Sequence, residues 1–168
     1  ILLAQLMFFM LVNAPEIFTQ IHISWINYFA ALIFVIASVT DFFDGYIARC
    51  WDQKTKLGAI LDPLADKMLI LAAFLGLMML GRASAWAVYL ILVREFFITG
   101  FRVVMASDGV EVAASMAGKV KTVSQMFAVG FLLMSWPGGE LLLWIAVALT
   151  LYSGFEYIFA YVKAMKKS

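Results

Sequence analysis

The feature that most constrains this chain is a series of long apolar runs separated by short polar breaks. We place the runs at about residues 1–12, 23–40, 64–80, 83–101, 120–136 and 141–161. Most approach the roughly 20 residues that a helix needs to cross the hydrocarbon core of a bilayer. Because 65% of the residues are hydrophobic and only 14% are charged, the chain has too little polar surface to coat a water-soluble globule.

The runs predict an all-α integral membrane protein, a bundle of about six transmembrane helices. Open sheets are excluded because their edge groups would stay unsatisfied in lipid. No linker or repeat divides the chain, so we expect one domain over residues 1–168. The first run is short and begins without a methionine, so we expect a leading segment to be missing. The alternative is the apolar region of a signal peptide, but no basic flank or small-residue cleavage site accompanies the run. A net charge of +1 gives no argument for nucleic acid binding.

The basic residues in the polar breaks predict an orientation. If the helices alternate in direction, one side of the membrane receives Arg49, Lys54, Lys56, Arg102, Lys119, Lys121, Lys163, Lys166 and Lys167. The opposite side receives Arg82, with Glu16 and Glu140. The positive-inside rule then places the basic side in the cytoplasm. For the C-terminal lysines, simple anchoring at lipid headgroups is the favoured reading.

Four aspartates gather where the second run ends and the third begins. Asp41 and Asp44 are three residues apart, and Asp62 and Asp66 are four apart, so each pair shares a helix face. A short loop between the helices brings both pairs to the same cytoplasmic depth. Four close carboxylates would repel one another, and an all-oxygen set selects hard cations, so we expect Mg²⁺ or Mn²⁺ rather than zinc. Two such ions about 3.5–4 Å apart suit in-line displacement at phosphorus.

Small residues bracket the acidic face. Gly45 and Ala48 follow Asp44, and Gly58 precedes Asp62 by one turn. Small side chains at these spacings leave room for a ligand, although close helix packing explains any one of them equally well. Arg49 lies beside the acids, where a diphosphate contact is favoured over snorkelling to the interface.

These eight positions reproduce, without departure, the signature D-x2-D-G-x2-A-R-x8-G-x3-D-x3-D, and the chain therefore resembles the CDP-alcohol phosphatidyltransferase family. The segments LDPLADKMLI, REFFITGFR and GKVKTVSQM resemble its bacterial phosphatidylglycerophosphate synthase branch. The resemblance covers most of the chain after about residue 23. Family members usually open with a short interfacial helix and a Pro-Asn…Arg segment, and neither is present here.

The resemblance implies that CDP-diacylglycerol donates its phosphatidyl group to glycerol 3-phosphate, which yields phosphatidylglycerol phosphate and CMP. It implies that Asp41, Asp44 and Asp62 bind two divalent cations, while Asp66 borders the second metal and serves as general base. It also implies that the CDP site is shaped by Gly45, Ala48, Arg49 and Gly58. A homodimer is common in the family, so we expect one here.

A phosphorylated acceptor requires a separate cationic site, which we assign to Arg94, Arg102, Lys119 and Lys121. Arg94 lies well inside an apolar run, where an isolated charge is costly and usually functional. Its neighbour Glu95 should point about 100° away around a helix, so we do not expect these two to pair. The alternative to a phosphate contact is that Arg94 pairs with a carboxylate of another helix, such as Glu156.

Two residues near the aspartates have ambiguous roles. Lys67 follows Asp66, and its side chain should point about 100° around the helix from that of Asp66. A surface or headgroup role is therefore as reasonable as catalysis. Pro63 either kinks its helix near the metals or lies within the first turn, where proline is tolerated.

Three other functions stay open. A Mg²⁺-dependent membrane prenyltransferase also uses aspartates, but with different spacing. A cation transporter would spread its acids toward the midplane, whereas these cluster at one end. Within the family, the acceptor could instead be serine, inositol phosphate or phosphatidylglycerol. The basic residues of the fourth and fifth runs favour a phosphorylated acceptor, and the choice of glycerol 3-phosphate rests mainly on the resemblance.

Overall fold

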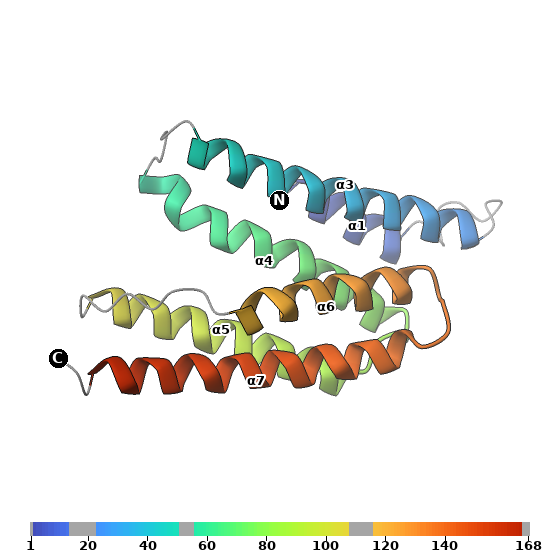
Figure 1. Ribbon diagram of the computed structural model, residues 1–168. Helices are drawn as coiled ribbons and strands as arrows, with labels where there is room; N and C mark the ends of the chain where they lie inside the picture. Colours follow the sequence, from blue (N-terminus) through green and yellow to red (C-terminus); the bar gives the residue numbers. More distant parts are fainter. Residues whose placement is uncertain (1, 14–22, 51–55, 108–115, 166–168) are drawn as a thin grey trace.

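The computed structural model describes residues 2–13, 23–50, 56–107 and 116–165, which are almost entirely helical. For 23, 41–50, 56–66, 103–104, 106–107 and 164–165 it describes the backbone alone. The helices are α1 (Leu2–Val12), α3 (Ile23–Cys50), α4 (Lys56–Met79), α5 (Ala85–Ser107), α6 (Met116–Leu133) and α7 (Gly139–Met165) (Figure 1). Each predicted apolar run corresponds to one of them, so the all-α prediction is confirmed for this part of the chain.

The helices around the aspartates are longer than the apolar runs. The second run was expected to end at Thr40, but α3 continues to Cys50, and α4 begins at Lys56, before the expected start at Leu64. An apolar run marks only the hydrophobic part of a helix. Backbone hydrogen bonding continues through polar residues that are also compatible with a helix. Pro63 therefore lies inside α4 and not in its first turn, and it cannot donate the usual helical hydrogen bond to the carbonyl of Ala59.

The helices pack as two groups that share one core. Helix α1 packs against α3 and α4, while α7 packs against α5 and α6, and α4 contacts both α5 and α6. Figure 1 shows α3 and α4 above α5 and α7, with α6 between them. The largest fully buried apolar side chains are Met7, Leu11, Phe74, Leu77, Ile91, Met105, Leu133 and Leu143.

One glycine allows the close approach of α1 to α4. A Cβ atom at Gly76 would lie 2.9 Å from Cδ1 of Leu11, which is closer than van der Waals contact permits. A larger residue at this position would therefore force the Leu11 side chain to shift.

The two ends of the bundle differ in character. The turns between α4 and α5 and between α6 and α7 lie at one end, and the C-terminal ends of α3, α5 and α7 lie at the other (Figure 1). At the first end, Nη1 of Arg82 donates to Oδ1 of Asn27 at 2.8 Å and to the carbonyl of Leu133 at 3.2 Å. Arg82 thus ties the α4–α5 turn to α3 and α6. The alternation of helix direction assumed in the orientation prediction is present.

The outer surface of the bundle is strongly apolar. Large exposed side chains include Trp25, Tyr28, Phe29, Leu32, Trp86, Tyr89, Phe96, Phe97, Phe155 and Phe159. By length and composition, one helix of the described chain, Gly139–Lys163, can cross a membrane. The apolar stretches Ser24–Thr40 and Lys67–Met79 are shorter, and α5 is interrupted by Arg94 and Glu95. The described residues therefore contain six helices, while six membrane spans stay a prediction.

Candidate active site

The backbone places both aspartate pairs at one level of two neighbouring helices. Asp44 lies six residues before the end of α3 at Cys50, and Asp62 lies six residues after the start of α4 at Lys56. At 1.5 Å of rise per residue, each is about 9 Å from its helix end. Helices α3 and α4 contact each other and run in opposite directions (Figure 1). The two antiparallel helices expected for the signature are therefore present.

The other signature residues belong to the same two segments. Gly45, Ala48 and Arg49 lie in the last turns of α3, and Gly58 lies in the first turn of α4. The side chains of all eight signature positions fall outside the described residues, so their assignment to CDP and metal stays a prediction. The donor set itself fits a hard divalent cation, because its carboxylates all supply oxygen ligands. Among the side chains that are described, no group of three or more metal-ligating residues occurs.

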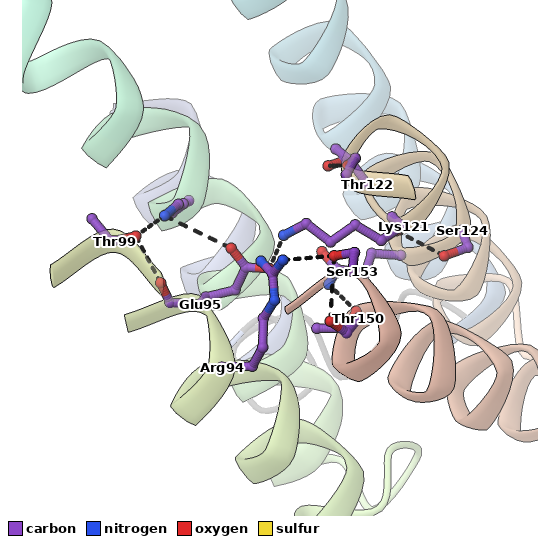
Figure 2. A network of polar contacts seen from close by, with 11 residues as sticks. Arg94, Glu95, Thr99, Lys121, Thr122, Ser124, Thr150 and Ser153 are labelled. Carbon is purple, nitrogen blue, oxygen red and sulfur yellow. Dashed lines mark hydrogen bonds and ion pairs between the residues drawn. The ribbon is translucent and has the colours of Figure 1, made fainter. Parts of the chain in front are cut away.

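A network of charged residues begins directly beside the signature, and Glu95 of α5 is its centre. Lys121 of α6 forms an ion pair with Oε1 of Glu95. Arg94 Nη1 lies 3.2 Å from the same oxygen, and Lys67 Nζ of α4 lies 3.7 Å from Oε2. Figure 2 shows Arg94, Glu95 and Lys121 converging. Three cations carried by three helices therefore meet one carboxylate.

Most of this network is shielded from solvent. The side chains of Arg94 and Lys121 are each 10% exposed and that of Glu95 is 13% exposed, whereas that of Lys67 is 34% exposed. Charged groups this enclosed are costly unless they are paired. Lys67 follows Asp66 directly in α4, so the more open side of the network adjoins the signature.

The hydroxyl groups of Ser153 and Thr99 form hydrogen bonds with members of the network. Nη2 of Arg94 donates to Oγ of Ser153 in α7 at 2.6 Å. Thr99 donates to the carbonyl of Glu95 at 2.6 Å and accepts a hydrogen bond from Nζ of Lys67. Arg94 also lies against the backbone of α7, because a Cβ atom at Gly154 would be 3.2 Å from its Nε. These contacts leave Arg94 little freedom to turn away.

One expectation about Arg94 is wrong. Arg94 does pair with Glu95, because the long side chains of both residues bend around the helix and span the 100° between their Cα positions. Its alternative partner Glu156 forms no ion pair with it. Instead, Nε of Arg94 and Oε2 of Glu156 are both buried without a hydrogen-bond partner among the described residues.

The four residues assigned to the acceptor phosphate do not all converge. Arg94 and Lys121 meet at Glu95. Lys119 is exposed in the first turn of α6, and no described contact joins it to Glu95. The guanidinium of Arg102 lies 6.0 Å from the ring centre of Tyr157, about two turns along α5 from Arg94.

The sequence analysis missed the central residue of this network. The sequence suggests Glu95 only as a partner for Arg94, and for Lys67 it leaves a surface or headgroup role and a catalytic role equally open. A signal was available, because an ionisable residue inside an apolar run usually has a functional reason to be there. Ser153 and Thr99 carried no such signal, since isolated hydroxyl residues are ordinary in membrane helices.

Comparison with known proteins gives a consistent result. The sequence model of the CDP-alcohol phosphatidyltransferase family matches residues 1–152. Three similar bacterial proteins all bear the name CDP-diacylglycerol–glycerol-3-phosphate 3-phosphatidyltransferase. The Bacillus subtilis protein is 46% identical over 146 residues, which is 82% of this chain and 76% of its own length. The Rickettsia felis protein is 42% identical over 146 residues, 82% of this chain and 78% of its own. The Escherichia coli protein is 41% identical over 149 residues, 82% of this chain and 81% of its own.

Proposed function

We infer the activity from the family: the chain belongs to the CDP-alcohol phosphatidyltransferase family. It transfers the phosphatidyl group of CDP-diacylglycerol to glycerol 3-phosphate, a step of phospholipid biosynthesis. The observation that carries this proposal is the 41–46% identity, over most of the chain, to bacterial enzymes named for that reaction. The intact signature on α3 and α4 supports it independently.

The signature residues divide the chemistry of this transfer. The hydroxyl oxygen of the acceptor forms a bond to the phosphorus that carries the diacylglycerol, and the bond from that phosphorus to CMP breaks. Asp66 takes the hydroxyl proton, which makes the oxygen a better nucleophile. The departing CMP keeps the bonding electron pair, and Arg49 contacts the diphosphate. Gly45, Ala48 and Gly58 leave room for CDP between the helices.

Two divalent cations, Mg²⁺ or Mn²⁺, would be held by Asp41, Asp44, Asp62 and Asp66. When bound, they would neutralise negative charge on the diphosphate and on the leaving group. The donor set supports this assignment, because four carboxylates at one level of two packed helices need positive charge to be stable.

The network beside Asp66 supports the proposed acceptor. Arg94 and Lys121 lie together at Glu95, within one packed cluster that includes Lys67. We assign the acceptor phosphate to Arg94 and Lys121, with Lys119 and Arg102 contributing from the surface. A cationic site of this kind favours a phosphate monoester over serine, which carries no net charge.

The surface of the bundle supports a location in the cell inner membrane. Large aromatic and aliphatic side chains are exposed on α3, α5 and α7, and lipid would cover them. We propose a multi-pass protein with the signature end in the cytoplasm, where the diphosphate meets water while the acyl chains stay in lipid. We also propose a homodimer, on family grounds alone.

The proposed reaction is tested by measuring CMP release from CDP-diacylglycerol by purified protein in detergent. The panel of acceptors contains glycerol 3-phosphate, inositol phosphate, serine and phosphatidylglycerol. We expect release with glycerol 3-phosphate only, together with a lipid product that carries a terminal phosphate. CMP release with serine contradicts the proposal, and so does the absence of release with every acceptor of the panel. Consumption of a prenyl diphosphate would favour the prenyltransferase alternative.

Removing a cation from the network should weaken acceptor binding. We expect Arg94→Ala and Lys121→Ala to raise the KM for glycerol 3-phosphate about tenfold or more, since a hydrogen bond to a charged group is worth about 1.5–3 kcal/mol. Lys119→Ala and Arg102→Ala should have smaller effects, because solvent screens exposed charges. The KM for CDP-diacylglycerol should stay constant. The matched control is Lys163→Ala, an exposed lysine of α7. An unchanged KM for glycerol 3-phosphate in Arg94→Ala would remove that residue from the site.

A further inference from the structure

Glu95 is the shared partner of three cations. Lys67, Arg94 and Lys121 each contact its carboxylate. A phosphate monoester, which carries a charge of about −1.5 to −2 at pH 7, is the kind of group that a set of converging cations binds.

We propose that Glu95 is a positioning residue for the acceptor: its carboxylate holds Lys67, Arg94 and Lys121 together so that they bind the phosphate of glycerol 3-phosphate as one preformed site. This inference rests on the proposed function. It adds Glu95 and Lys67 to the acceptor site, and it assigns Glu95 a role through its neighbours, without direct contact with substrate.

The physical reason is repulsion between the cations. Three positive groups from α4, α5 and α6 cannot stay within a few ångströms of one another in a shielded site unless a negative group lies between them. Glu95 supplies that group with both carboxylate oxygens, because Lys121 and Arg94 contact Oε1 and Lys67 contacts Oε2. A site assembled before the substrate arrives loses less entropy when the substrate binds.

The surroundings of the cluster indicate the side from which a phosphate can enter. Arg94 is held from one side by Ser153 and the backbone at Gly154, and Thr99 holds Lys67 against α5. Lys67 is the most exposed member of the cluster and the sequence neighbour of Asp66. A phosphate that enters on this side reaches Lys67 first, so the acceptor hydroxyl can lie toward the signature end of α4.

The test compares Glu95→Gln and Glu95→Asp with the unmodified protein in steady-state assays of CMP release. Glutamine keeps the shape but not the charge, so we expect the KM for glycerol 3-phosphate to rise about tenfold or more. The value of kcat should fall less, and the KM for CDP-diacylglycerol should not change. Aspartate keeps the charge and should restore part of the affinity. The matched control is Glu140→Gln, an exposed carboxylate at the opposite end of the bundle.

A double substitution separates positioning from a general structural role. Once Lys121→Ala has removed one cation, Glu95→Gln should raise the KM for glycerol 3-phosphate by much less than it does alone. The inference would be overturned if the two substitutions raised the KM for glycerol 3-phosphate by independent factors that multiply in the double variant. An equal rise in the KM values of glycerol 3-phosphate and CDP-diacylglycerol would also overturn it. If Glu95→Gln fails to fold, the KM of Glu95→Asp for glycerol 3-phosphate decides: a value equal to that of the unmodified protein, with Lys67→Ala also unchanged, overturns the inference. Absence of transfer to glycerol 3-phosphate by the unmodified protein would instead overturn the proposed function.

Discussion

Replacing Asp66 with asparagine is expected to abolish turnover while largely sparing the binding of CDP-diacylglycerol. Asparagine has nearly the same shape as aspartate, but it cannot accept the proton of the attacking hydroxyl. General-base catalysis typically contributes about 10²–10⁴-fold to a rate, so kcat should fall by at least about a hundredfold. The measurement is CMP release at saturating glycerol 3-phosphate, with a separate titration of CDP-diacylglycerol binding.

The control for this prediction is Asp52→Asn. Asp52 lies between α3 and α4 in the sequence but outside the signature, so its loss should leave kcat nearly unchanged. Near-normal activity of Asp66→Asn would remove Asp66 from the role of general base. Loss of both activity and substrate binding would indicate that Asp66 acts mainly as a metal ligand.

Removing divalent cations is expected to have a comparably large effect. Treatment with a chelator should reduce CMP release by about a thousandfold or more, because metal ions stabilise charge in such transition states by several kcal/mol. Added Mg²⁺ or Mn²⁺ should restore the activity. Zinc should restore little, since an all-carboxylate site suits harder cations. Release that continues without metal would contradict the assignment of the four aspartates.

Single substitutions connect this metal requirement to particular residues. In Asp41→Asn or Asp62→Asn, half-maximal activity should require a higher Mg²⁺ concentration, because each change removes one negative ligand. The Glu140→Gln variant should keep the Mg²⁺ dependence of the unmodified protein, since Glu140 lies at the far end of the bundle (Figure 1). An unaltered Mg²⁺ requirement in both aspartate variants would show that the ions bind elsewhere.

The order of the helices and the position of the signature followed from sequence alone. Apolar runs report which segments avoid water, and the spacing of Asp41 and Asp44 depends only on the helical repeat. The ends of α3 and α4 did not follow in the same way. Polar residues after Thr40 continue the helix to Cys50, because hydropathy does not mark where backbone hydrogen bonding stops.

The sequence predicted the convergence of only some of the residues assigned to the acceptor phosphate. Two of its four assigned residues, Arg94 and Lys121, lie together, whereas Arg102 is two turns away along α5. Sequence spacing predicts neighbours within one helix, but it does not predict how neighbouring helices are rotated and shifted against each other. The position of Lys121 beside Glu95 depends on the packing of α6 against α4 and α7.

The sequence by itself determined the class of the protein, its family and the eight signature positions, since these depend on composition and on local spacing. Only the tertiary structure decided that Glu95 joins Lys67, Arg94 and Lys121. The physical reason is that these contacts link three helices through long, flexible side chains, and packing alone selects which of their possible partners come within reach.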